Sequence, residues 1–159
     1  MIAEVSADLG VQVILEPGRV IAGNAGVMLT TALYEKTAPD RSFLIVDAGM
    51  NDLMRPALYG AHHDIQPLKQ AAPDAPEKTY DVVGPICEST DKFASGRDMP
   101  AVEPGERLAF MSAGAYGAVL SSSYNTRPLV PEVLVNGDRF DIVRRRPDLE
   151  EMLQLEQVI

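Results

Sequence analysis

The chain has 159 residues, of which 46% are hydrophobic and 23% charged, as is usual for one globular domain. Its formal net charge of -9 repels phosphate backbones and anionic lipid headgroups, so we expect no binding to nucleic acid or to a membrane. The one basic cluster, residues 144–146, is followed by acidic residues that offset its field.

Cys87 is the only cysteine, which excludes an internal disulfide and any metal site built from several thiolates. We expect a reducing, cytoplasmic setting. No apolar stretch approaches the roughly 20 residues that span a bilayer, and residues 1–4 do not open a signal sequence. His62 and His63 lack a third ligand, so we expect an exposed structural pair and no metal site.

The first elements indicate an α/β unit. Residues 2–9 have helical composition, Gly10 fits a helix C-terminus, and residues 11–15 form a short apolar run typical of a buried parallel strand. A short helix is expected at residues 20–24. Because a lone parallel strand has no partner, residues 1–26 are expected to be the end of a larger unit.

From residue 27 the pattern changes to short strands. Residues 27–35 and 42–47 predict a hairpin around the Pro39-Asp40 turn signal. A short helix or turn is expected at residues 50–59, and an exposed loop at residues 70–78.

The remaining elements continue this alternation of strands and turns. Further strands are expected at residues 80–84, 107–110, 131–135 and 139–143. Asn136-Gly137 predicts a tight hairpin between the last two strands, and Pro147 and Asp148 mark the start of a helix over residues 148–156. The fold class is therefore mainly β (α+β), an antiparallel β-sandwich or Greek-key barrel with short helices at its edges.

Four short blocks carry the residue types of a chemical site. In chain order they are Glu16-Pro17-Gly18-Arg19, Arg55-Pro56-Ala57-Leu58-Tyr59, Gly84-Pro85-Ile86-Cys87-Glu88-Ser89-Thr90-Asp91 and Gly114-Ala115-Tyr116-Gly117. Gly18 and Arg19 suit a phosphate-binding turn. Arg55 and Tyr59 are four residues apart, so on a helical turn both project from one face and can bind a carboxylate.

Each block alone has an ordinary structural interpretation. The first would be a plain strand-to-helix turn, and the second a surface arginine beside a core tyrosine. Cys87 would be a small buried side chain, and Tyr116 an aromatic residue in a tight turn.

In this order the blocks resemble the fold-type III pyridoxal-phosphate-dependent decarboxylases of basic amino acids. Asp47-Ala48-Gly49-Met50-Asn51-Asp52-Leu53, Ser122-Ser123-Tyr124-Asn125 and Arg127-Pro128 belong to the same pattern. The resemblance extends over residues 11–153 and is strongest to the diaminopimelate branch. It implies a C-terminal β-domain in residues 27–159, preceded in residues 1–26 by the last strand and helix of a (β/α)8 barrel.

For such an enzyme the resemblance implies a lyase of lysine biosynthesis, which converts meso-2,6-diaminopimelate to L-lysine and CO2. It implies that Glu16, Pro17, Gly18 and Arg19 contact the phosphate of pyridoxal 5'-phosphate. Arg19 would also reach a substrate carboxylate.

The resemblance assigns further substrate ligands to the later blocks. Arg55 and Tyr59 would bind the substrate, and Tyr116 would touch both substrate and cofactor. Cys87 would be the catalytic acid, since a thiol is mainly protonated at neutral pH, and Glu88 would face the distal amino group of the substrate. In the family this loop completes the active site of the neighbouring subunit in a homodimer, although Thr90 stands where a glycine is commoner.

A lysine suited to the cofactor is missing from the pattern. Pyridoxal phosphate is held covalently by a lysine, but Lys36, Lys69, Lys78 and Lys92 lie in strand ends or polar loops. The family places its lysine early in the barrel. We therefore expect this chain to be the C-terminal portion of a longer enzyme and to be inactive alone.

Two alternatives stay open. The substrate of the enzyme can be ornithine, arginine or carboxynorspermidine, although ornithine has no distal carboxylate for Arg55. The chain can also be a non-catalytic β-domain used for dimerisation or regulation, which would have no need of Cys87, Glu88 and Tyr116.

Overall fold

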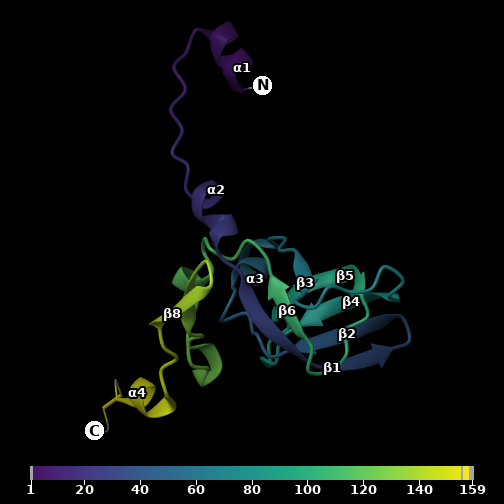
Figure 1. Cartoon of the computed structure of the whole chain (residues 1–159). Helices are drawn as coiled ribbons and strands as arrows, with labels where there is room; N and C mark the ends of the chain where they lie inside the picture. Colours follow the sequence, from purple (N-terminus) through teal and green to yellow (C-terminus); the bar gives the residue numbers. More distant parts are fainter. Residues whose placement is uncertain (1, 155, 158–159) are drawn as a thin grey trace.

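The computed structural model describes residues 2–154 and 156–157. Residue 1 of the expected first domain, and residues 155, 158 and 159 of the second, lie outside the described residues. Figure 1 shows an extended N-terminal arm, a compact β-structure, and a separate hairpin that leads to the C-terminal helix.

The helices are short and lie outside the β-structure. They are α1 (Ile2–Leu9), α2 (Arg19–Ala22), α3 (Arg55–Tyr59) and α4 (Leu149–Leu153), with 3-10 turns η1 (Gly23–Ala25), η2 (Ala118–Leu120) and η3 (Tyr124–Thr126). The strands are β1 (Met28–Ala38), β2 (Arg41–Val46), β3 (Ile65–Pro67), β4 (Glu77–Val83), β5 (Lys92–Pro100), β6 (Arg107–Phe110), β7 (Glu132–Asn136) and β8 (Arg139–Arg144).

Six strands form one sheet in the order β3-β6-β1-β2-β4-β5. The expected β1–β2 hairpin is confirmed, with Ala38 paired to Arg41 across the Pro39-Asp40 turn. Every pair is antiparallel except β2 and β4. This parallel pair is possible because a long connection containing α3 and β3 separates the two strands in sequence. The mainly β class is confirmed.

The two edge strands of this sheet lie close together, so the sheet is a nearly closed barrel. Arg97 on β5 donates from Nη1 to the carbonyl of His63, just before β3, at 3.1 Å. Inside the barrel Phe93 and Phe110 have ring centroids 4.6 Å apart, and Leu108 is fully buried. Tyr80 is also fully buried, and its hydroxyl accepts a hydrogen bond from Val102 N.

Strands β3 and β5 were not expected from the sequence. Strand β3 has three residues, too few for a periodic pattern. In β5 only Phe93 and Met99 are buried hydrophobic residues, and Gly96, with a φ of 58°, interrupts the strand. Neither strand therefore shows the alternation on which a sequence-based prediction depends.

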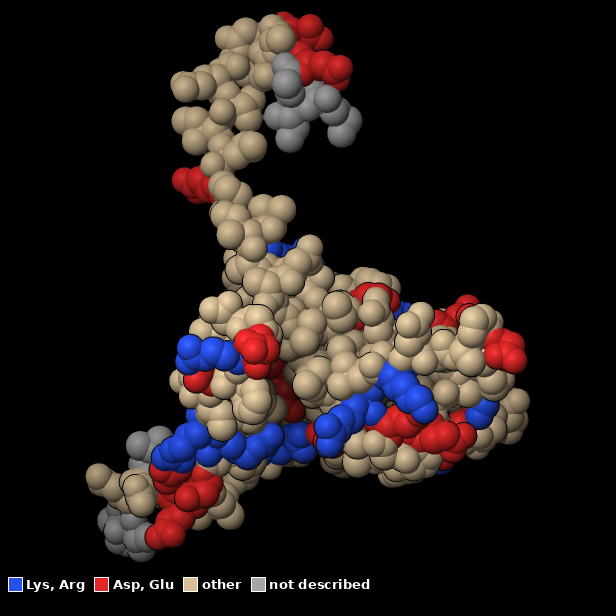
Figure 2. Space-filling view, viewed as in Figure 1, with Lys and Arg blue, Asp and Glu red and all other residues tan. Residues whose placement is uncertain are grey.

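The N-terminal arm confirms two expectations and contradicts one. The helix over residues 2–9 and the short helix near residue 20 are present. The expected buried strand at residues 11–15 is wrong, because this segment is extended, unpaired and exposed, with Ile14 78% accessible. No described strand runs beside it to pair with its backbone. Figure 2 shows few charged atoms on this arm, and Val20 and Ile21 are 79% and 70% accessible.

The C-terminal segment is a hairpin followed by a short helix. Strands β7 and β8 pair through Asn136 and Arg139, and Gly137 supplies the positive φ of 63° that the tight turn requires. Asp148 caps α4 in a capping box with Glu151. The helix ends at Leu153, earlier than expected. None of the helices in the described part of the chain is long and apolar enough to cross a membrane.

Candidate functional site

Backbone contacts hold the loop at residues 112–117 against the turn at residues 23–26. Ala113 N donates to Gly26 O at 2.8 Å, and Gly114 N donates to Gly23 O at 3.0 Å. A Cβ atom at Gly114 would lie 2.1 Å from the carbonyl oxygen of Ala22, so only glycine permits this approach. The base of the N-terminal arm therefore has a fixed position beside the Tyr116 loop.

This contact brings Gly18, Arg19 and Tyr116 to one place. A Cβ atom at Gly18 would be 3.9 Å from the Tyr116 hydroxyl oxygen, an ordinary van der Waals distance, so Gly18 lies next to this hydroxyl. Tyr116 is 49% accessible and has a φ of 57°, a left-handed conformation that costs free energy in a non-glycine residue. Glu16, Pro17 and Arg19 are also exposed.

Arg55 is tied to the same loop through His63. Arg55 Nη1 lies 3.1 Å from His63 Nε2, and His63 Nδ1 lies 2.8 Å from the carbonyl oxygen of Met111, which directly precedes this loop. Tyr59, at the other end of α3, is 65% accessible. The expected placement of Arg55 and Tyr59 on one helical turn is present in α3.

The expectation of an exposed histidine pair is wrong for His63. Its side chain is only 2% accessible, whereas His62 is exposed. Burial lowers the pKa of His63, the bond to Met111 opposes this shift, and the positive charges of Arg55 and Arg19 lower the pKa further. Both guanidinium groups are thus close enough to His63 to act on it electrostatically.

The Cys87 loop is held at both ends and exposed between them. Asp91 is buried and accepts hydrogen bonds from Ile86 N at 2.6 Å and Met50 N at 2.7 Å. Burial raises the pKa of Asp91, although these two hydrogen bonds act in the opposite direction. Cys87 and Glu88 are exposed, so both side chains are accessible to a ligand or another molecule.

The loop at residues 47–53 connects the Cys87 loop to the segment after Tyr116. Arg127 Nε donates to Asn51 Oδ1 at 3.0 Å, and its Nη2 donates to the Asp47 carbonyl at 2.7 Å. Arg127 also forms an ion pair of 3.3 Å with Asp52, whose carboxylate is buried. Because Met50 in the same loop binds Asp91, one polar network links the Cys87 loop to Arg127.

The structure thus brings some of the expected residues together and keeps others apart. Gly18, Arg19 and Tyr116 form one cluster, and Arg55 joins it through His63. Cys87 and Glu88 lie on a separate loop, and none of the hydrogen bonds between described residues links that loop directly to Tyr116 or Arg55. The cluster offers cationic and hydroxyl donors, which suit phosphate and carboxylate groups.

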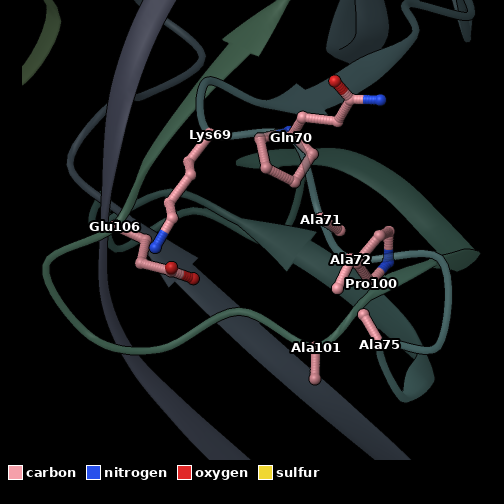
Figure 3. Close-up of a pocket in the computed structure, with 9 residues that line it drawn as sticks. Lys69, Gln70, Ala71, Ala72, Ala75, Pro100, Ala101 and Glu106 are labelled. Atoms are coloured by element: carbon pink, nitrogen blue, oxygen red, sulfur yellow. The ribbon is translucent and has the colours of Figure 1, made fainter.

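A separate hollow lies outside this site. It has a volume of about 340 Å³ and includes none of the expected site residues. Figure 3 shows Lys69 and Glu106 on one side of it and alanines on the other. It offers too few converging polar groups to fix a ligand. Over residues 2–154 and 156–157, no group of three or more His, Cys, Asp or Glu side chains is placed to hold a metal ion.

His63 and Asp91 are the supporting residues that the sequence analysis missed. His63 and Ile65 are buried while His62, Asp64 and Gln66 are exposed, but the residue types do not distinguish His63 from His62. This alternation is that of a strand with one face in the core. Asp91 had no signal either, since one of its two partners is the backbone amide of Met50 in a distant loop.

Three comparisons place the chain among known proteins. A diaminopimelate decarboxylase of Zymomonas mobilis is 43% identical over all 159 residues of this chain and 37% of its own length. One from Vibrio cholerae is 47% identical over 93% of this chain and 35% of its own length. The structure is similar to a Helicobacter pylori diaminopimelate decarboxylase complexed with L-lysine, with 40% identity, 97% of this chain covered, 37% of that chain covered and a TM-score of 0.81.

The chain spans little more than a third of the length of these relatives. Residues 8–114 match the model of the pyridoxal-dependent decarboxylase family that describes its C-terminal sheet domain. This match covers more than half of the chain, in agreement with the nearly closed β-barrel. The chain therefore belongs to the family of pyridoxal-dependent ornithine, diaminopimelate and arginine decarboxylases.

Proposed function

We propose that this chain supplies the substrate-binding and proton-donating residues of a diaminopimelate decarboxylase. The reaction is the conversion of meso-2,6-diaminopimelate to L-lysine and CO2, with pyridoxal 5'-phosphate as cofactor. The cluster of Gly18, Arg19 and Tyr116, with Arg55 held beside it, is the observation that carries the proposal. Residues 1–26 would then complete a (β/α)8 barrel that bears the cofactor lysine, and residues 27–159 would be the β-domain.

The residues of the cluster fit the cofactor. Because Gly18 has no side chain, a phosphate would have access to its backbone beside the Tyr116 hydroxyl. Glu16 and Pro17 lead into this turn. The bound cofactor would act as an electron sink for the electron pair left when CO2 departs.

Arg19, Arg55 and Tyr59 fit the substrate. Diaminopimelate has two carboxylates, and one of them remains in the product. An arginine fork binds a carboxylate through two parallel hydrogen bonds, and a tyrosine hydroxyl adds one donor. The similar Helicobacter pylori structure holds L-lysine, which is the product of the proposed reaction.

Cys87 would complete the reaction as the proton donor. When the bond between the reacting carbon and the leaving carboxylate breaks, its electron pair stays with the substrate, and the carbon then takes a proton from Cys87 Sγ. Water returns a proton to the sulfur. Glu88 would bind the distal ammonium group of the substrate by charge attraction.

Because Cys87 and Glu88 are exposed on a loop separate from the cluster, we infer that they serve the active site of a second subunit. The protein would then act as a homodimer with two shared sites. The loop would be rigid enough for this role, since Asp91 holds it at both ends.

A chimera tests the function. The C-terminal 37% of the Zymomonas mobilis relative, which is the part that this chain matches, is replaced by residues 1–159. Release of CO2 is measured with meso-diaminopimelate, ornithine, arginine and carboxynorspermidine. We expect activity on diaminopimelate alone, and loss of activity in a Cys87→Ala variant. A preference for ornithine would refute the substrate.

The second candidate is a non-catalytic dimerisation or regulatory domain. The exposed apolar side chains of the β7–β8 hairpin favour it, since Val135 and Phe140 are 68% and 72% accessible. A chimera that dimerises and binds pyridoxal phosphate but releases no CO2 from any of the four substrates would support this second candidate.

A further inference from the structure

His63 is a buried histidine whose two ring nitrogens both have partners. Its side chain is 2% accessible, and it lies just before β3, between α3 and the loop that follows β6. The carbonyl oxygen of Met111, 2.8 Å from Nδ1, can only accept a hydrogen bond. Nδ1 therefore carries a proton.

The other contact fixes the rest of the protonation state. Arg55 Nη1 is 3.1 Å from His63 Nε2, and a guanidinium nitrogen can only donate. Nε2 must therefore present its lone pair to Arg55. A single neutral tautomer, protonated at Nδ1, satisfies both contacts.

The surroundings of His63 favour this neutral form. Arg19 on α2 and Arg55 on α3 are both close enough to disfavour a charged imidazole, as is His62. Arg97 on β5 donates to the His63 carbonyl and forms an ion pair with Asp64 at 3.8 Å. The backbone of His63 is thus fixed from β5 while its ring is fixed from Met111.

A fixed ring holds the arginine that it contacts. Arg55 is only partly buried, and an arginine side chain loses considerable conformational freedom when it binds a ligand. The bond from Nη1 to His63 removes part of this freedom in advance. It uses one donor and leaves the others for a carboxylate, so the side chain is preorganised without being neutralised.

On the basis of the proposed function, we infer that His63 is a positioning residue that holds the Arg55 guanidinium in the orientation that binds the substrate carboxylate retained in the product. A carboxylate in the place of His63 would form an ion pair with Arg55 and compete with the substrate. A neutral imidazole acceptor orients the guanidinium and keeps its full positive charge available.

The test uses the chimera with the Zymomonas mobilis relative and three single variants of it. His63→Leu removes both hydrogen bonds, His63→Gln keeps one donor and one acceptor, and His62→Leu is the matched control at the exposed neighbour. We expect His63→Leu to raise KM for meso-diaminopimelate about tenfold with a smaller change in kcat. His63→Gln should restore part of the loss, and His62→Leu should leave KM unchanged.

Two product-like inhibitors separate this role from a general loss of structure. L-lysine has the retained carboxylate, and 1,5-diaminopentane is the same molecule without it. His63→Leu should weaken inhibition by L-lysine about tenfold and leave inhibition by 1,5-diaminopentane unchanged. An equal loss for both inhibitors, or no loss for L-lysine, would overturn the inference.

A spectroscopic measurement tests the geometry without activity. Long-range 1H–15N NMR spectra of the 159-residue chain should show His63 as the neutral tautomer protonated at Nδ1, and the Nε2 signal should shift in an Arg55→Met variant. The opposite tautomer would overturn the inference. If the wild-type chimera has no activity on diaminopimelate, the proposed function is refuted, and this role of His63 with it. If only the His63→Leu variant has a normal KM, the role of His63 alone is refuted.

Discussion

The anchoring of the Cys87 loop by Asp91 leads to a quantitative prediction. Asp91 accepts hydrogen bonds from Met50 N and Ile86 N at 2.7 and 2.6 Å. Hydrogen bonds to a charged group contribute about 1.5–3 kcal/mol each. Asp91→Asn keeps one acceptor but turns an amide N–H towards the other donor, so it loses one bond.

Burial of the charge offsets part of this loss. Burial raises the pKa of Asp91, so the ionised carboxylate is itself partly destabilised in the fold, and a neutral amide avoids that cost. We therefore expect Asp91→Asn to lower the free energy of unfolding by about 2 kcal/mol. Asp91→Ala leaves two buried donors unsatisfied and should cost about 4 kcal/mol.

Urea unfolding of the purified chain, followed by circular dichroism, measures both variants. Asp98→Asn is the matched control, because Asp98 is exposed on β5 and, among the described residues, its side chain bonds only to the exposed Thr79 hydroxyl. This control should change stability by less than about 0.5 kcal/mol. If the Asp91 variants are as stable as the control, Asp91 does not anchor the loop.

Three further predictions concern the other contacts of the site. Gly114→Ala should destabilise the chain by about 2 kcal/mol in urea unfolding, because its Cβ would meet the Ala22 carbonyl at 2.1 Å; unchanged stability would contradict the close approach. The fold lowers the pKa of His63. The neutral His63 ring therefore contributes to stability above about pH 6.5, and this contribution is lost as the pH falls through the folded-state pKa. Unfolding free energies should therefore fall more steeply below pH 6.5 in the wild type than in His63→Gln, and parallel curves would argue against burial of a neutral imidazole. Arg127→Met should cost about 3 kcal/mol by the same assay, since it leaves the buried Asp52 without its ion pair; an effect below about 0.5 kcal/mol would show that this network is not structural.

Elements with a strong local signal were predictable from the sequence. The β1–β2 hairpin has two apolar runs around Pro39-Asp40, and the β7–β8 hairpin has the Asn136-Gly137 turn. Helix α4 has its capping box. In each case residues close in sequence determine the structure, so the pattern is sufficient.

Elements that depend on distant partners were not predictable in the same way. Residues 11–15 have the composition of a buried strand, but burial requires a neighbouring strand that the described residues do not include. Strand β5 pairs with β4 along its length although its own sequence does not alternate. Tertiary pairing overrides propensity in both cases.

The candidate site shows the same division. The blocks around Arg19, Arg55, Cys87 and Tyr116 were visible as short motifs. The buried groups that support Arg55 and the Cys87 loop are His63 and Asp91, and each of them bonds a backbone group far away in sequence. Only the folded structure shows those contacts.

The central claim is that residues from two copies of this chain share one active site, and a subunit-mixing experiment tests it directly. One chimera carries Arg55→Met and a second carries Cys87→Ala. Each is expected to be inactive as a homodimer. When the two are mixed and allowed to exchange subunits, each mixed dimer contains one site with both natural residues. We predict recovery of about a quarter of the wild-type activity, since about half of the dimers are mixed and each has one intact site. If subunit exchange is demonstrated and activity still does not recover, the claim is contradicted.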